Sequence, residues 1–355
     1  MRSLAWALLL GVAIATTSGS QPERKVVDVA NSSELVDQLR GQPHDVTIRL
    51  APGRYEVPPQ NEPGTAPAGL LVSGRNVRII GDGPEDVVIN TVADCVIRFE
   101  NCDDCEIDNV RVAGNISVGG GSVHISNCVV DNGIQAVHGD FVIESNEISS
   151  SWDGIDLANA HAVVANNLIV GLTDEHDANV DAGVRIRGDA TVSMKRNHIR
   201  GFPAGLALMW KASVDCTANI IEDIDGIGID GTDGGLGRIT IRENAIYRCG
   251  SPGIAIWADG DQQATRNLIV STGRSKPREG AVLALGSHAD AAIRKNTLYD
   301  NTVTNPGLDR DVSREAFWRA RRPWTRTYRN TAVGVDGRHR FYESAFLTRY
   351  GRWAD

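Results

Sequence analysis

The segment that decides the fold is VIESNEISSSWDGIDLANAH, residues 142–161. It begins with alternating apolar and polar residues, reaches an asparagine and a turn, and ends with a glycine followed by a second alternating run. Alternation with a period of two is typical of a β-strand that buries one face. The segment therefore predicts short strands joined by turns, with Asn146 and Gly154 at the corners.

The same pattern returns along the chain, as in VSMKRNHIRGFPAGLALMWKA (192–212), VDCTANIIEDIDGIGIDGTDG (214–234) and ITIRENAIYRCGSPGIAIWADG (239–260). The recurrent asparagines are Asn127, Asn146, Asn167, Asn197, Asn219, Asn244, Asn267 and Asn296, and the glycines paired with them are Gly133, Gly154, Gly183, Gly205, Gly226, Gly253 and Gly280. The asparagines are 19 to 30 residues apart, with no helical pattern between them. Such a period predicts a β-solenoid.

In a solenoid of this kind each coil contributes about three strands, which pair in parallel with the neighbouring coils about 4.8 Å away. Copies of one position then form a row along the stack. We expect five asparagines to turn inward and hydrogen-bond to one another along such a row, namely Asn146, Asn167, Asn197, Asn219 and Asn244. The recurrent glycine is expected to adopt a backbone conformation that other residues resist.

These repeats resemble those of the right-handed parallel β-helix proteins, the pectate-lyase-like superfamily and its carbohydrate-binding and sugar-hydrolase-type relatives, over about residues 45–300. The resemblance implies an all-β, single-stranded right-handed parallel β-helix with a helical cap at its N-terminal end. It also implies a carbohydrate-active function. It does not specify the chemistry, because the superfamily includes lyases, hydrolases, epimerases and a copper-maturation protein.

The two ends of the chain are expected to differ from the repeats. Residues 1–20 join a basic start, an apolar run and small residues, which predicts a signal peptide and a secreted or periplasmic protein. The stretch 31–41 predicts a helix within an N-terminal cap at 21–44, with the β-helix following at 45–305. Residues 313–355 hold ten arginines and nine of the 19 aromatic residues. We expect segment 306–355 to cover the last coil, or alternatively to offer a surface to an anionic partner.

The net charge and the cysteine content limit the kinds of partner and metal site that are expected. The formal net charge of −9 argues against nucleic-acid binding. The apolar run at residues 4–15 is too short to span a membrane, and a monomer is expected. Cys102 and Cys105 have the spacing of half a metal site, but no second half follows. The six cysteines are therefore interpreted as small core residues, with disulfides permitted.

Candidate site residues lie on the strand after the recurrent glycine, where alternate side chains point outward. Aligning the coils on the glycines puts Asp156 and Arg185 on adjacent coils of one outward row. The next outward row then contains Arg187, Met209, Asp230 and Trp257. The candidate substrate-binding residues are Trp152, Asp153, Trp210 and Trp257. A structural network of ion pairs is the alternative interpretation of the charged residues.

The longest spacing, from Asn167 to Asn197, predicts a loop just before Arg185. This loop contains Asp174-Glu175-His176-Asp177, which loosely resembles the Asp-Pro-His-Glu or Asp-Pro-His-Asp motif of the alginate epimerases and departs from it at Glu175. Asp174 and Asp177 could bind Ca²⁺. Otherwise no cofactor is expected.

The candidate chemistry follows from these residue types. Proton abstraction from a uronic acid needs a cation beside the carboxylate and a nearby base. Arg185, Arg187 and Lys211 are the candidate cations and His176 the candidate base, with Asp156 and Asp230 also in the predicted catalytic set. The sequence thus favours β-elimination or epimerisation of an extended, acidic polysaccharide.

Two alternative functions remain open. One is a non-catalytic glycan-binding or surface β-helix protein. The other is a glycoside hydrolase with paired carboxylates, because SWDGIDLAN at residues 151–159 resembles a polygalacturonase segment.

Overall fold

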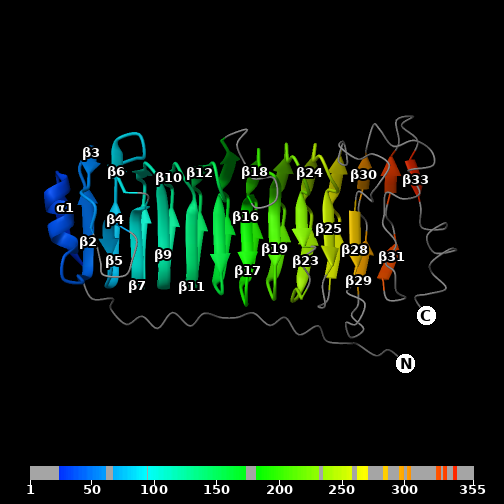
Figure 1. The fold of residues 1–355 in the computed structure, drawn as a ribbon, viewed down its shortest axis with the longest axis horizontal. Helices are drawn as coiled ribbons and strands as arrows, with labels where there is room; N and C mark the ends of the chain where they lie inside the picture. Colours follow the sequence, from blue (N-terminus) through cyan, green and yellow to red (C-terminus); the bar gives the residue numbers. More distant parts are fainter. Residues whose placement is uncertain are drawn as a thin grey trace, which may run out of the picture.

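The computed structural model describes residues 24–60, 67–93, 95–172, 181–231, 235–257 and 262–270, and beyond these only strands β28 to β33. Strands stack side by side along one long axis, with the chain order preserved from one end to the other (Figure 1). Neighbouring coils pair in parallel throughout the stack, and the only antiparallel strand pair among the described residues joins β32 and β33. The expected parallel β-solenoid is confirmed.

Each coil passes through three rows of strands, named here the first, second and third ladders. The first ladder contains β4 (Ala68–Val72), β13 (Ile155–Ala158), β16 (Ala182–Arg187), β19 (Ala204–Met209), β22 (Ile229–Gly231), β25 (Ile254–Trp257) and β28 (Leu283–Gly286). The second contains β1 (Lys25–Val29), β2 (His44–Leu50), β5 (Arg75–Ile80), β14 (His161–Ala165), β17 (Thr191–Lys195), β20 (Ser213–Thr217), β23 (Ile239–Arg242), β26 (Gln262–Thr265), β29 (Asn296–Tyr299) and β31 (Thr325–Tyr328). Three long strands, β7 (Cys95–Asp108), β9 (Asn115–Ser126) and β11 (Ile134–Glu144), run through both ladders and join them into one 20-stranded sheet.

The third ladder is a separate 13-stranded sheet. It contains β3 (Gly53–Glu56), β6 (Val87–Asn90), β8 (Arg111–Val112), β10 (Val129–Val130), β12 (Glu147–Ser150), β15 (Leu168–Gly171), β18 (His198–Arg200), β21 (Ile220–Glu222), β24 (Ala245–Tyr247), β27 (Leu268–Val270), β30 (Thr302–Thr304), β32 (Thr331–Val333) and β33 (His339–Phe341). Alternation buries every second residue of each strand. On this ladder the inward position is isoleucine in six successive coils: Ile148, Ile169, Ile199, Ile221, Ile246 and Ile269.

The predicted N-terminal helix is present as α1 (Ser32–Leu39), at the end of the stack (Figure 1). Asn31 caps it by accepting a hydrogen bond from the Glu34 backbone N–H (3.0 Å), and the Glu34 carboxylate accepts one from the Ala30 N–H (2.8 Å). Leu35 and Leu39 are buried in the core of the first coils. Strands β2 and β3 follow this helix.

The corner between the second and third ladders contains the asparagine ladder. Each side-chain NH2 group donates to the side-chain oxygen Oδ1 of the asparagine in the next coil, at 2.9–3.1 Å. The row runs from Asn146 through Asn167, Asn197, Asn219 and Asn244 to Asn267. The predicted inward row is therefore confirmed and includes one more residue, Asn267. All six side chains are at most 2% exposed, so this row replaces water for a set of buried polar groups.

Two of the asparagines assigned to this repeat occupy other positions. Asn127 is exposed with φ 50°, and the neighbouring Cys128 takes the ladder position, where its N–H donates to the Asn146 side chain. Asn296 begins β29 and pairs with Gln262. Their assignment was wrong because an Asn two residues before an apolar residue also occurs one residue early at a corner, as at Asn127, and at the start of a strand, as at Asn296.

Each residue just before the ladder asparagine has a left-handed backbone, and one of these residues is an alanine, Ala218, with φ 56°. An L-residue with a β-carbon is strained there by about 1–2 kcal/mol. Ala218→Gly should therefore raise the free energy of unfolding by up to about 1 kcal/mol, after the loss of chain entropy on folding is counted. Denaturant titration would measure the change.

The adjacent Thr217 provides the control, because it lies in β20 with an ordinary extended backbone. Thr217→Gly should destabilise the protein. Equal destabilisation by Ala218→Gly and Thr217→Gly would contradict the strain argument.

The corner between the third and first ladders contains a stack of glycines, Gly154, Gly183, Gly205, Gly228 and Gly253. A β-carbon on Gly154, Gly183, Gly205 or Gly228 would lie 2.4–2.8 Å from the carbonyl oxygen of the next glycine. None of these four has a left-handed backbone. These glycines were expected because of an unusual backbone conformation, and this reason was wrong at the four positions. Glycine is required there because neighbouring coils approach too closely for a β-carbon. Among the described glycines of this row, Gly133 has a left-handed backbone, with φ 81°.

Several predicted regions lie outside the described residues. They are the signal peptide at 1–20 and most of the Arg-rich segment at 306–355. Within that segment, β31 and β32 continue the parallel pairing. Over the part of the chain that the structure describes, no helix is long and apolar enough to cross a membrane. The six cysteines are buried thiols.

Candidate functional site

The outward rows of the first ladder carry the charged residues predicted from the repeat. The register aligns Gln135, Asp156, Arg185, Ala207, Asp230 and Ala255 in one row. The second row aligns Val137, Ala158, Arg187 and Met209. Asp156 and Arg185 are thus on adjacent coils, and Arg187 lies beside Met209, as expected.

The predicted position of Asp230 was wrong by one outward row. Asp230 pairs with Ala207 and Ala255, not with Met209 and Trp257. The glycine stack explains the error, because Gly228 occupies the stacking position and Gly226 lies two residues earlier. The coil sequence DGIGID offers two glycines with the same spacing from an isoleucine, so the sequence pattern alone favoured neither.

Two ion pairs connect the coil of β13 with the coil of β16. The Arg187 guanidinium donates two hydrogen bonds to the Asp156 carboxylate, from Nε (3.0 Å) and Nη2 (2.8 Å). Arg185 Nη1 lies 2.8 Å from Asp153 Oδ2. The second oxygen of Asp153 accepts from the Ala182 backbone N–H at 2.8 Å. Arg187 is thus held by a bidentate contact and Arg185 by a single ion pair.

Asp153 has the most unusual electrostatic environment of the site. Its side chain is only 16% exposed. Burial is the main reason that the pKa of Asp153 is raised from 3.8 to about 6, and the charges of Asp156 and Asp181 contribute to the increase. The Arg185 guanidinium and the Ala182 N–H oppose it. A carboxyl group in this range exchanges a proton near neutral pH. Asp153 is therefore better suited to acid–base chemistry than its predicted role in substrate binding implied.

The raised pKa predicts how Asp153 affects stability. The folded protein holds this proton up to about pH 6 and the unfolded chain only up to about 3.8, so the folded state binds more protons between these values. The contribution of Asp153 is most favourable below pH 3.8 and declines as pH rises through 6, by up to about 3 kcal/mol in total. Wild type should lose stability relative to Asp153→Asn between pH 4 and 7, as measured by denaturant midpoints. Parallel pH curves for the two proteins would contradict the assignment.

Asp181, which was not among the predicted site residues, belongs to the same group. It is 4% exposed and lies immediately before β16. Its charge contributes to the raised pKa of Asp153. A sequence signal was available, because Asp181 stands four residues before the outward-pointing Arg185, at the corner that begins β16.

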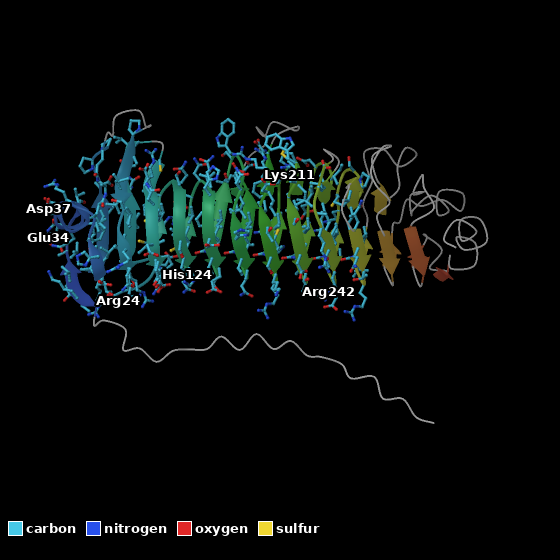
Figure 2. All side chains as sticks on the ribbon, turned by 90° about the horizontal axis from the view of Figure 1, so that it is seen from below. Arg24, Glu34, Asp37, His124, Lys211 and Arg242 are labelled. Atoms are coloured by element: carbon cyan, nitrogen blue, oxygen red, sulfur yellow. The ribbon has the colours of Figure 1, made fainter. Side chains whose placement is uncertain are left out.

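Other predicted residues lie at the ends of the first-ladder strands. Trp152 precedes β13 and is 67% exposed, while Trp210 follows β19 and is 56% exposed. The Lys211 Nζ lies 3.5 Å from the Asp189 carboxylate. Lys211 lies toward the upper edge of the stack in Figure 2, and His124 and Arg242 of the second ladder lie along the lower edge. Lys211 is thus paired with Asp189, not with the carboxylates of the site.

The remaining predicted residues are not placed by the structure. Asp174, His176 and Asp177 lie outside the described residues, as does the side chain of Trp257. Within the described ranges no group of three or more His, Cys, Asp and Glu side chains is arranged to hold a metal ion. The predicted Ca²⁺ loop is not part of those ranges and stays a prediction.

The architecture and register define the class: the chain is a right-handed parallel β-helix protein, and residues 94–269 match the family model described as "Right handed beta helix region". Among solved structures, it is similar to the A-module of the mannuronan C-5 epimerase AlgE4 of Azotobacter vinelandii. That likeness has a TM-score of 0.60 at 14% identity, covering 88% of this chain and 94% of the module.

Two further solved structures are more distant. The catalytic domain of a GH87 alpha-1,3-glucanase gives a TM-score of 0.49 at 12% identity and covers 88% of this chain and 70% of its own. An alginate lyase from Paenibacillus sp. str. FPU-7 gives 0.40 at 13% identity, covering 87% and 99%. No curated protein matches the chain. At these identities the likenesses show the fold and not the reaction.

Proposed function

We propose that this protein is an exported enzyme that acts on an extended, acidic polysaccharide by β-elimination or C5 epimerisation. The observation that carries the proposal is Asp153, a buried carboxyl with a pKa of about 6 held beside Arg185 on the outward face of the solenoid. The likeness of the fold to a mannuronan C-5 epimerase module supports a uronate-containing substrate. A flat ladder of strands also offers the elongated surface that a polysaccharide needs.

Each residue has a role in this reaction. Arg185 and Arg187 neutralise the substrate carboxylate, which stabilises the negative charge that forms when the C5 proton leaves. Deprotonated Asp153 accepts that proton, and His176 remains the base predicted from the sequence. In β-elimination the C4–O bond then breaks, the leaving sugar oxygen takes up a proton from water, and a C4–C5 double bond forms. In epimerisation a proton returns to C5 from the opposite face.

The ion pair with Asp153 leaves Arg185 with N–H donors that could bind the substrate. A guanidinium group carries five N–H donors, and the contact with Asp153 engages Arg185 through Nη1. The neighbouring row position on the next coil is Ala207, whose small side chain leaves space over the sheet between Arg185 and Asp230. A uronate carboxylate approaching over Ala207 would meet Arg185 from the side opposite β13.

A second function, glycan binding without catalysis, is favoured by a different observation. Both arginines are already neutralised by carboxylates, as in a structural network. Trp152 and Trp210 expose large aromatic surfaces near the site, and such surfaces suit contact with apolar ring faces. A binding protein needs only these aromatic contacts and a few polar groups.

A screen on defined glycans tests the proposal. Purified protein and Asp153→Asn would be incubated with polymannuronate, polyguluronate, polygalacturonate and neutral glucans, with and without EDTA. A lyase produces ultraviolet absorbance from the new double bond, an epimerase exchanges C5 hydrogen for deuterium in D₂O, and a hydrolase releases reducing ends alone. We expect the first or second signal, rising with an apparent pKa of about 6 and lost in Asp153→Asn. Ligand-induced thermal stabilisation without any of these signals would support the binding function instead.

A further inference from the structure

Two buried thiols meet at the corner of β7 where the chain passes from the first ladder to the second. Cys102 and Cys105 are each 1% exposed, and the pairing register of β7 with β9 shifts between them. Asn101 and Asp104 have left-handed backbones, with φ 49° and 57°. These two bends turn both side chains toward the inside of one corner.

The surrounding coils hold this corner in place from both sides. The Cys102 thiol donates to the Val72 carbonyl at 3.3 Å, and the Cys105 thiol to the Gly74 carbonyl at 3.6 Å. On the other side, a β-carbon on Gly121 would lie 1.8 Å from the Cys102 carbonyl oxygen. The backbone of the next coil is thus packed directly on the corner, and the two thiols share a fixed and narrow space.

We infer that Cys102 and Cys105 are a modification site that closes to an intramolecular disulfide when the chain folds in the presence of a disulfide oxidant. The inference does not depend on the proposed enzymatic function. It goes beyond the sequence interpretation, in which the cysteines are core residues and disulfides are permitted but no pair is assigned. Two thiols in contact can join in a disulfide, whereas a cysteine that is only buried cannot.

The contact between the thiols also makes them unequal. In the folded chain the interaction between the two groups raises the pKa of Cys102 and lowers the pKa of Cys105. The other buried cysteines have non-thiol contacts instead: Cys128 donates to the Ser126 carbonyl at 3.0 Å, and Cys216 contacts the Asn244 side chain at 3.6 Å.

The exchange with glutathione disulfide balances without any further reactant. One of the two cysteine thiolates attacks one glutathione sulfur, and the first glutathione leaves as its thiolate. The other cysteine thiolate then attacks the protein sulfur of the mixed disulfide, and the second glutathione leaves. Two protein thiols are oxidised, one glutathione disulfide is reduced, and the two thiol protons pass to the two glutathione molecules. Because both thiols are buried in the folded chain, the exchange belongs to the folding stage.

The test is refolding of the full chain from denaturant in glutathione buffers of increasing oxidised fraction. The samples are then quenched with acid, alkylated with iodoacetamide in denaturant and digested with trypsin. The peptide of residues 99–111, between the cleavage sites after Arg98 and Arg111, contains both cysteines and no other. After oxidative refolding it should carry no alkyl group and weigh two hydrogen atoms less than the dithiol peptide. After refolding with dithiothreitol it should carry two alkyl groups.

Two variants make the result specific. In Cys105→Ser the remaining Cys102 should be alkylated or joined to glutathione, whereas Cys128→Ser, which removes an equally buried cysteine, should leave the disulfide in residues 99–111 intact. Circular dichroism would confirm that the reduced wild type folds. The inference is overturned if wild-type peptide 99–111 carries two alkyl groups or glutathione in every buffer, or if the disulfide joins one of its cysteines to another peptide.

Discussion

Arg187→Ala should lower turnover of the uronate substrate by a hundredfold or more. The substitution removes a cation that the proposed reaction needs beside the substrate carboxylate, and loss of one such electrostatic contact typically lowers rates by about 10²–10³. The change should appear in kcat, because the charge that Arg187 stabilises develops in the transition state. Steady-state kinetics on the best uronan from the glycan screen would measure it.

Arg187→Ala should also destabilise the fold, contrary to the sequence expectation of a free surface residue. The Asp156 side chain is 10% exposed and would lose its bidentate partner. Activity must therefore be expressed per folded molecule.

The third ladder offers a matched control in the pair Arg111 and Asp131. This pair also joins adjacent coils through two bonds, each of 3.0 Å. Arg111→Ala should leave turnover unchanged. Equal turnover by folded Arg187→Ala and Arg111→Ala would identify both as structural ion pairs.

Asn197→Leu should lower the free energy of unfolding by about 4 kcal/mol or more. The Asn197 side chain accepts from the backbone and side-chain N–H groups of Asn167 (3.1 and 3.0 Å). It donates to the Val164 carbonyl and the Asn219 side chain (2.8 and 2.9 Å). Leucine makes none of these bonds and leaves buried donors unpaired, each at a penalty of about 1–3 kcal/mol.

Asn90→Leu is the control for the ladder, since the Asn90 amide contacts only the exposed Glu56 carboxylate, at 3.1 and 3.3 Å. Its effect should be below about 1 kcal/mol. Urea denaturation midpoints of both variants and of wild type would measure the two losses of stability. A loss in Asn197→Leu no larger than in Asn90→Leu would show that the ladder contributes little net stability.

The fold could be predicted because its determinants are local and repeated. An asparagine two residues before an apolar residue marks a corner, and alternation marks the strands on either side. Exact register was harder to predict wherever one coil offered the motif twice. Because DGIGID contains two glycines, Asp230 was predicted one outward row away from its true position. Asn127 stands one residue before the true ladder position at Cys128.

The candidate site could be predicted only as a row of residues. The sequence placed Asp156 near Arg185, but it could not show that Asp156 binds Arg187 while Arg185 binds Asp153. Which carboxylate binds which guanidinium depends on side-chain conformations across two coils. The pKa of Asp153 is still less accessible, because it results from burial combined with three charged neighbours.

The corner of the asparagine ladder has the same length in every described coil that contains it. Two residues separate the second-ladder strand from the third-ladder strand at 145–146, 166–167, 196–197, 218–219, 243–244 and 266–267. The other corners vary, and the coil from Asn167 to Asn197 is the longest, with eight residues (173–180) outside the described ranges between its third-ladder and first-ladder strands. A corner of constant length keeps each coil in register with its neighbours, whatever the length of the other corners. A foreign loop grafted between β15 and β16 would therefore leave the pairing of the strands unchanged.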